Sequence, residues 1–318
     1  MRTLITGGFG YLGGRLAQFL VKQAGYTVLL GSRQQTRPPD WLSHVEVVQT
    51  RWDSPASLEQ ICIGVNAVVH LAGMNAQDCT ADPAAALEIN GLATARLLNA
   101  AIKQGVKRFI YLSTAHIYGN PLAGVITEET CPTNLHPYVT SHRAGEDVVR
   151  AAHQRGEIEG IVIRLSNGYG APAHKDANCW MLLVNDLCRQ AVQLKELRLR
   201  SSGLQRRDFI TVTEVVRAVL HCLDMPRTEC GDGLFNLGGG CAVRVIDLAN
   251  HIASRCGEVL GYIPPILLPQ ASASENDLPL TYRIDKLLAT GFNPRDDSDE
   301  EIDATLRLCM VAFGREIK

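Results

Sequence analysis

A run of glycines near the start of the chain has the spacing of a phosphate-binding loop, Gly7-Gly-Phe-Gly-Tyr-Leu-Gly13. It follows an apolar stretch and precedes apolar residues at helical spacing, so we expect a strand to end and a helix to begin there. The free N–H groups at such a helix start attract phosphate. Gly7 permits the turn, Gly10 lets the backbone approach a pyrophosphate, and Gly13 lets the helix pack closely on the strand. The plainer alternative is a tight strand–helix turn without a ligand. The predicted dinucleotide contacts in this loop are Gly7, Phe9, Gly10, Tyr11, Leu12 and Gly13.

Strands and helices that must position this loop alternate along the first half of the chain. Strand-like runs occur at residues 27–30, 45–48, 67–71, 109–112 and 161–165, and helical patterns at 11–24, 57–62, 83–104 and 137–154. Continuous β-branched strands separated by helices indicate a parallel sheet that is covered on both faces. Right-handed crossovers then predict a doubly wound α/β fold of the Rossmann type, which binds its ligand at the carboxyl ends of the strands.

The second half of the chain has a different pattern, in which loops, short helices and brief strands replace the alternation. We therefore expect a dinucleotide-binding Rossmann domain over residues 1–170, including the helix at 137–154. A smaller, mixed α/β substrate lobe is expected over residues 171–318, with some segments returning to the Rossmann sheet.

Composition excludes several classes of partner. The net charge of −2 gives no sign of a nucleic-acid or membrane surface, and no apolar run reaches membrane-spanning length. The first strand follows Met1 directly, which leaves no room for a signal peptide. The cysteines show no Cys-x-x-Cys pair and no zinc spacing. We therefore expect a cytoplasmic protein with reduced thiols and no metal.

More motifs follow the glycine loop in a fixed order. They are His70-Leu-Ala-Gly73, Asn90, Leu112-Ser-Thr-Ala-His-Ile-Tyr-Gly119, Tyr138-x-x-x-His142, Arg164-x-x-Asn-x-Tyr-Gly170 and Arg207-Asp-Phe-Ile210. From Met1 to about Asn293, the chain resembles the extended short-chain dehydrogenase/reductases, and within them the sugar-nucleotide epimerase/dehydratase branch. The resemblance implies a nicotinamide dinucleotide and a nucleotide-sugar substrate. The further dinucleotide contacts that it implies are Leu71, Ala72, Gly73, Asn90, Leu112, Tyr138 and His142.

The resemblance also assigns catalytic roles. In that family a Tyr is the general acid/base on a sugar hydroxyl or carbonyl, and a Ser/Thr bonds the same oxygen. A Lys four residues after the Tyr holds the nicotinamide ribose and favours the tyrosinate. By position, Tyr138 is the implied acid/base and Thr114 its hydroxyl partner, with Ser113 beside it.

Position 142 departs from this pattern, because it is His142 rather than Lys. It lies one helical turn after Tyr138 on the same face. A histidine can bond a ribose hydroxyl, but with its ordinary pKa it is mostly neutral at pH 7. One interpretation is a working enzyme in which His142 partly replaces the lysine. Others are a dinucleotide-binding protein that has lost or changed its chemistry, or an exposed helix residue of no consequence.

The reaction class is narrowed by Ala115-His116. Family 4,6-dehydratases carry an acidic pair at this place, so standard dehydration is disfavoured. His116 either acts as an acid/base in an epimerisation or simply lines the substrate site. Two reactions remain, reduction of a keto-sugar nucleotide, which we favour, and epimerisation through a transient ketone.

Dinucleotide preference is encoded at the end of the second strand, Gly31-Ser32-Arg33. An acidic residue there accepts the ribose hydroxyls of NAD, whereas a small residue followed by Arg suits the 2′-phosphate of NADP. Ser32, Arg33 and the nearby Arg37 therefore favour NADP over NAD, although they also fit an ordinary turn. The family also places an Asp near the adenine after the third strand. By spacing Arg51 occupies that place here, and Asp53, two residues further on, is the acid assigned to the adenine side.

Substrate and subunit contacts are implied by the same resemblance. Asn167 and Arg207 correspond to residues that hold the substrate diphosphate, and a guanidinium fork suits phosphate. Arg198 and Arg200 either join them or form a solvated charged face. The helices at 83–104 and 137–154 pair across a homodimer as a four-helix bundle in this family. The apolar residues that would serve the core and that interface are Leu87, Leu97, Leu98, Val148 and Val149.

Overall fold

A seven-stranded sheet forms the centre of the molecule. The computed structural model describes residues 1–34, 37–269 and 277–314. The strand order is β11-β7-β5-β4-β1-β2-β3, and every neighbouring pair is parallel. The strands are β1 (Arg2–Thr6), β2 (Thr27–Ser32), β3 (Glu46–Gln49), β4 (Ala67–His70), β5 (Arg108–Thr114), β7 (Glu159–Leu165) and β11 (Leu234–Leu237). This order confirms the predicted doubly wound fold.

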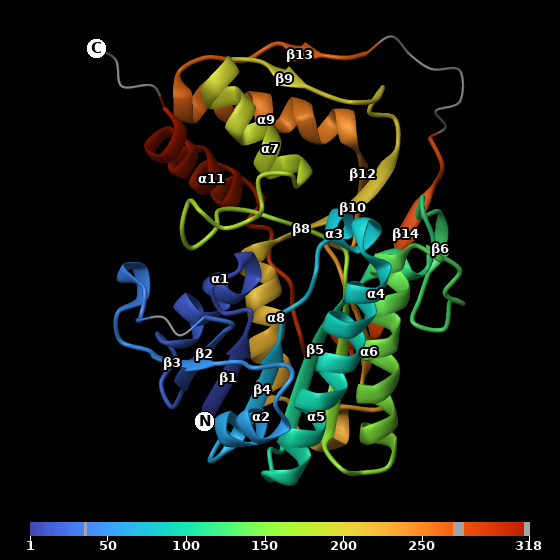
Figure 1. The fold of residues 1–318 in the computed structure, drawn as a ribbon. Coiled ribbons are helices and arrows are strands. Elements are labelled where there is room, and N and C mark those ends of the chain that lie inside the picture. The colour runs from blue at the N-terminus through green and yellow to red at the C-terminus, as the bar shows by residue number, and fades with distance from the viewer. Residues whose placement is uncertain (35–36, 270–276, 315–318) are drawn as a thin grey trace.

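Helices cover both faces of this sheet (Figure 1). On one face lie α1 (Tyr11–Leu20) and α8 (Val212–Asp224), and on the other α2 (Pro55–Cys62), α5 (Ala93–Lys103) and α6 (Pro137–Gln154). Neighbouring strand residues enter opposite cores, as Leu4 and Ile5 do in β1. Because both faces are buried, the inner strands contain continuous apolar runs, such as Ala67-Val-Val69 in β4, instead of alternating.

The expected regular helix at 83–104 is interrupted. It consists of α4 (Pro83–Ala86), a π-helical turn η2 (Leu87–Leu92) and α5. The extra residue of a π turn changes the direction in which its side chains point, and such turns are frequent at functional sites. This turn contains Asn90. A short helix α3 (Ala76–Ala81), which sequence patterning did not indicate, precedes it.

The second half of the chain builds a smaller lobe above the carboxyl ends of the strands (Figure 1). Its helices α7 (Leu183–Leu194), α9 (Val245–Leu260) and α11 (Ser298–Phe313) share one hydrophobic core. Its largest sheet joins β8 (Asn167–Tyr169), β10 (Arg206–Thr211) and β12 (Ala242–Arg244). The remaining short elements of the second half are β9 (Leu197–Arg198) with β13 (Ile266–Leu267), β14 (Leu280–Tyr282), α10 (Asp285–Leu288) and η4 (Arg227–Glu229). The first half adds η1 (Asp40–Leu42), η3 (Ala115–Ile117) and β6 (Gly124–Ile126), which pairs with β14.

Two segments from beyond residue 171 return to the large sheet. β11 pairs with β7, and α8 packs over the face that α1 covers. In the part of the chain that the structure describes, no helix is both long and apolar enough to cross a membrane. The same residues contain no group of three or more His, Cys, Asp or Glu side chains placed to hold a metal ion.

Candidate active site

The glycine loop begins α1 without any side chain in the way. Gly7 has φ +68°, and a Cβ there would lie 2.9 Å from the nitrogen of Ala72, at the end of β4. A Cβ on Gly13 would overlap the Gly7 carbonyl, so only glycine allows α1 to pack so closely. Gly10 precedes the helix, and no side chain caps the first N–H groups of α1. This uncapped start fits a phosphate group.

Side chains in the loop contact other parts of the protein. The Tyr11 hydroxyl donates to the Gly170 carbonyl at 3.0 Å, and Leu12 packs against the core. Phe9 lies edge-on to Trp41, and its carbonyl accepts a hydrogen bond from His174 at 3.0 Å. Any phosphate contact made by these loop residues therefore comes from their backbone N–H groups.

The Tyr138 phenol meets the Thr114 hydroxyl where β5 ends beside the start of α6. The Thr114 hydroxyl hydrogen-bonds the Tyr138 phenol, and the buried Ser113 Oγ has no hydrogen-bond partner among the described residues. Burial raises the pKa of Tyr138 to about 12 and outweighs the lowering effect of Thr114. The phenol therefore keeps its proton at pH 7.

His142 is buried one turn further along α6. Its Nδ1 lies 2.9 Å from the Tyr138 carbonyl oxygen, and the two rings are 4.3 Å apart between centroids. Because a carbonyl oxygen can only accept, Nδ1 carries the hydrogen and Nε2 is left as an acceptor. Nε2 lies close to Gly73, since a Cβ added there would be 3.7 Å from it. Burial lowers the pKa of His142 to about 4, so the ring is neutral at pH 7. The interpretation as an exposed helix residue is therefore wrong.

Asn90 connects the loop after β4 to α6. Its Oδ1 accepts a hydrogen bond from the Met74 nitrogen at 2.8 Å, and its Nδ2 donates to Ser141 Oγ at 3.0 Å. Nδ2 also lies 3.3 Å from His142 Nδ1. With Ala72 against the glycine loop, the structure brings one group of predicted dinucleotide contacts together. That group is Gly7, Leu71, Ala72, Gly73, Asn90 and His142, while Leu112 is half-buried in β5 and packs against the core.

A second buried histidine, His70, lies behind this group. The Thr94 hydroxyl donates to the Asn90 carbonyl, so His70 Nε2 must donate to Thr94 Oγ1 at 2.9 Å. His70 Nδ1 then accepts from Thr6 Oγ1 at 2.6 Å. Burial, and to a smaller extent His142, lowers the pKa of His70 to about 3. In the sequence, only the His70-Leu-Ala-Gly73 motif indicated that His70 lies near the dinucleotide contacts.

The predicted substrate side also converges. Burial lowers the pKa of His116, and the nearby Arg207 and His136 lower it further. Arg207 donates to Gln205 at 3.0 Å, and burial lowers its own pKa. A half-buried cation therefore lies beside His116, as a site for an anionic group requires. Sequence patterning missed His136, whose ring also accepts the Tyr138 N–H at the start of α6.

Asn167 and Arg207 lie on neighbouring strands. Asn167 is opposite Phe209 in the parallel pair of β8 and β10, and its Nδ2 donates to the Asp208 carbonyl at 2.8 Å. Arg200 is exposed after β9, in a different sheet, and Arg198 pairs with Glu196. The structure thus groups Asn167 with Arg207 and leaves Arg200 apart from their sheet.

The end of β2 presents free cations. Arg33 and Arg37 are exposed, and within residues 1–34, 37–269 and 277–314 no side-chain hydrogen bond or ion pair is found for either. The Ser32 carbonyl accepts the Thr50 N–H at 2.7 Å, which holds the strand end against the segment after β3. Asp53 is exposed in the turn that follows β3.

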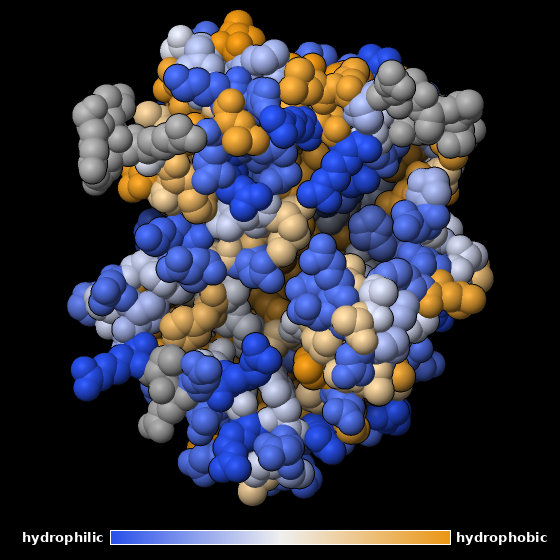
Figure 2. All heavy atoms as spheres, turned by 45° about the horizontal axis from the view of Figure 1, so that its top comes forward, coloured by the Kyte–Doolittle hydropathy of each residue, from blue (hydrophilic) through white to orange (hydrophobic). Residues whose placement is uncertain are grey.

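Figure 2 shows a hollow between the two lobes, with hydrophobic residues inside it and hydrophilic residues around it.

Comparisons with known proteins identify the family of this chain. Residues 3–238 match the model of the NAD dependent epimerase/dehydratase family. The chain therefore belongs to that family, which lies within the extended short-chain dehydrogenase/reductases. A similar curated relative is the dTDP-glucose 4,6-dehydratase of Streptomyces niveus, 25% identical over 270 residues that span 81% of this chain and 78% of the relative.

Solved structures give the same fold over nearly the whole chain. MoeE5 in complex with UDP-glucose and NAD has a TM-score of 0.78 at 25% identity, covering 99% of this chain and 100% of that one. The UDP-glucuronic acid 4-epimerase from Bacillus cereus in complex with NAD has a TM-score of 0.80 at 21% identity, covering 98% and 100%. RMD from Pseudomonas aeruginosa complexed with NADPH has a TM-score of 0.76 at 21% identity, covering 98% and 99%.

Proposed function

We propose that this protein reduces the carbonyl group of a nucleotide-linked keto-sugar. When bound, a reduced nicotinamide dinucleotide supplies the hydride that adds to the carbonyl carbon. Tyr138 gives its proton to the carbonyl oxygen, so the product is an alcohol. The Thr114 hydroxyl, which already bonds the Tyr138 phenol, donates to the same oxygen and orients it.

The observation that carries this proposal is the setting of the Tyr138 phenol, whose ring lies 4.3 Å between centroids from that of His142, with no lysine at position 142. Carbonyl reduction needs a proton donor, and a phenol with a pKa of about 12 is one at every physiological pH. Epimerisation instead begins by removing a proton from a sugar hydroxyl, which needs a base. A cation at position 142 would favour the tyrosinate, but His142 is neutral at pH 7. The chain is therefore better suited to donate a proton than to take one.

The residues present also fit the dinucleotide. The uncapped start of α1 suits its pyrophosphate, and His142 Nε2 is an acceptor for a ribose hydroxyl. The Arg33 guanidinium beside Ser32, which pairs with no side chain of the described residues, favours NADP over NAD, because a 2′-phosphate supplies a negative charge for it. Asp53 remains a proposed adenine-side contact.

The substrate class follows from the second half of the chain. We assign the diphosphate of a nucleotide-sugar to Asn167 and Arg207, and the sugar to the space between Arg207, His116 and Tyr138. The relatives' names support this class, because they include enzymes of dTDP-glucose and UDP-glucuronic acid. Ala115 offers no acid for a dehydration.

The proposed division of the chain is a dinucleotide domain over residues 1–170 and a substrate lobe over residues 171–318.

Epimerisation is the second candidate, because solved epimerases have the same fold over nearly the whole chain. The test begins by denaturing the purified protein and identifying any released dinucleotide by mass. The protein is then offered NADPH with keto-sugar nucleotides that carry uracil or thymine. Consumption of NADPH in step with alcohol formation is expected. Retained NAD with interconversion of two sugar epimers would establish the epimerase instead. Dinucleotide binding without either reaction would indicate a non-catalytic binding protein.

A further inference from the structure

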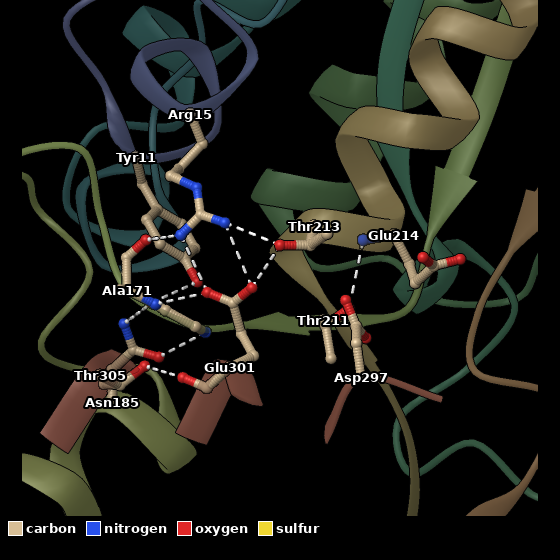
Figure 3. Close-up of polar contacts among 11 residues, drawn as sticks. Tyr11, Arg15, Ala171, Asn185, Thr211, Thr213, Glu214, Asp297, Glu301 and Thr305 are labelled. Carbon is tan, nitrogen blue, oxygen red and sulfur yellow. Dashed lines mark hydrogen bonds and ion pairs between the residues drawn. The ribbon is translucent and has the colours of Figure 1, made fainter. Parts of the chain in front are cut away.

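A buried ion pair joins the first helix to the last one. Arg15 of α1 and Glu301 of α11 form two charge-assisted hydrogen bonds, from Nη1 to Oε1 at 2.9 Å and from Nη2 to Oε2 at 3.2 Å (Figure 3). The Glu301 side chain is 4% exposed. Arg15 lies one helical turn after Tyr11, so the pair is anchored next to the glycine loop.

The same pair holds the chain where it leaves β8. The Ala171 carbonyl accepts from Arg15 Nη1 at 2.7 Å, and the Ala171 nitrogen donates to Glu301 Oε1 at 3.0 Å. One residue earlier, the Gly170 carbonyl accepts from Tyr11 and from Asn185 Nδ2. The end of β8 is therefore fixed to α1 through the Gly170 and Ala171 carbonyls and to α11 through the Ala171 nitrogen. Figure 3 shows Ala171 beside Arg15 and Glu301.

The end of β10 is held by the same helix α11. Thr213 follows β10, and its hydroxyl donates to Glu301 Oε2 at 2.5 Å while accepting from Arg15 at 2.8 Å. The Thr211 hydroxyl donates to Asp297 Oδ1 at 2.7 Å. β8 and β10 carry Asn167 and Arg207, so the residues that follow both strands of the proposed diphosphate site, Ala171 and Thr213, contact the same ion pair.

We propose that Arg15 and Glu301 are positioning residues that couple the dinucleotide site to the nucleotide-sugar site. A ligand that fixes the start of α1 also fixes Arg15, and through Glu301 it fixes the ends of β8 and β10. The ordering required for the second ligand is then already complete, so each ligand binds more tightly when the other is present. The identities of the two ligands rest on the proposed function.

Calorimetry tests this coupling without any turnover. NADPH is titrated alone and with saturating UDP or dTDP, whichever binds better, and the diphosphate is titrated with and without NADPH. We expect the wild type to show roughly tenfold mutual enhancement. Glu301→Gln removes the negative charge at similar shape and should reduce the enhancement to less than about twofold. The double variant Arg15→Met, Glu301→Leu should do the same without leaving a buried unpaired charge.

Asp303→Asn is the matched control on α11. Asp303 accepts hydrogen bonds from Arg255 and Arg307 and lies outside the Arg15–Glu301 contacts, so the variant should keep the full enhancement. The proposal is overturned if the wild type binds both ligands independently. It is also overturned if Glu301→Gln or the double variant Arg15→Met, Glu301→Leu keeps the enhancement. A wild type that binds neither diphosphate overturns the proposed function as well. A wild type that couples the ligands but reduces no keto-sugar overturns the proposed function alone.

Discussion

His142 Nδ1 lies 2.9 Å from the carbonyl oxygen of Tyr138, and this contact determines what the imidazole presents to the rest of the site. With Nδ1 occupied as a donor, Nε2 is an acceptor that lies close to Gly73. Burial keeps the ring neutral and also raises the pKa of the Tyr138 phenol. The reactivity of the site therefore depends on a phenol that holds its proton tightly.

Replacing His142 by Lys should lower the apparent pKa of Tyr138. An opposite charge nearby favours the tyrosinate by roughly 1–3 pH units. Reduction needs the protonated phenol, which is present below the pKa and lost above it. Wild-type kcat/KM for reduction should therefore stay level into alkaline pH. In His142→Lys the alkaline decline of this activity should begin at a lower pH. The reverse reaction, oxidation of the alcohol, should become faster in that variant. His142→Gln, which adds no charge, is the control. Identical pH profiles for all three proteins would contradict this account.

Removing the Tyr138 hydroxyl tests its role as proton donor. Tyr138→Phe should lower kcat by about 10²–10⁴, the usual range for a general acid, while the Kd for NADPH changes little. Thr114→Val should cost less, since it removes only the orienting hydrogen bond. Steady-state kinetics and calorimetry on the same samples measure both quantities. Full activity in Tyr138→Phe would move the proton donor elsewhere, with His116 as the next candidate.

His142 should also make the fold sensitive to acid. Its pKa is near the ordinary 6.5 when unfolded and about 4 when folded, so the unfolded state binds more protons between those values. The contribution of the neutral His142 ring to the free energy of unfolding is fully present above pH 6.5 and is lost as the pH falls towards 4. At pH 5 the loss is about 2 kcal/mol. His142→Gln lacks this titration, so its stability relative to wild type should improve by that amount between pH 7.5 and 5. Urea unfolding at both pH values measures it, and equal pH dependence would show that the ring is not buried neutral.

Arg33 should discriminate between the two dinucleotides. If its guanidinium binds a 2′-phosphate, Arg33→Ala should weaken NADPH by about tenfold or more and leave NADH nearly unchanged. NADH is the internal control, because it lacks only that phosphate. Equal weakening of both dinucleotides would assign Arg33 to the fold or to general attraction, and no change would leave Ser32–Arg33 as an ordinary turn.

Subunit pairing should depend on Leu87 and Leu92. Three of the residues proposed for the interface, Leu97, Leu98 and Val149, are at most 3% exposed and belong to the core. Leu87 is 51% exposed and Leu92 is 46% exposed on the η2 turn. Leu87→Glu with Leu92→Glu should convert a homodimer to monomers, since charges are costly in a buried apolar interface. Light scattering of the folded variants reports the mass. An unchanged dimer would place the interface elsewhere.

Local patterns were sufficient to predict six strands of the central sheet, whereas β11 was not recognised as a strand. Apolar runs such as Leu4-Ile5 mark the strands, and the glycines at 7, 10 and 13 fix where the first one ends. The π turn at Asn90 was not predictable, because its residues have ordinary helical patterning and tertiary contacts to Met74 and Ser141 select the irregular turn.

The candidate site was predictable in its residue types but not in its charges. The type of residue at position 142 is visible in the sequence, whereas its ionisation depends on how deeply the fold buries it. The pairing of Arg15 with Glu301 joins residues 286 positions apart and leaves no periodic signal in either helix. Such partners become visible only when the packing of the two lobes is known.

The Arg15–Glu301 pair also constrains how the chain is assembled during synthesis. Arg15 leaves the ribosome 286 residues before its carboxylate partner. Until then, its guanidinium lacks the anion with which it pairs in the folded protein. The edge of β7 that pairs with β11 stays open over much of the same interval. The nascent first half therefore cannot reach its final form alone, and the emergence of the last helix completes both halves together.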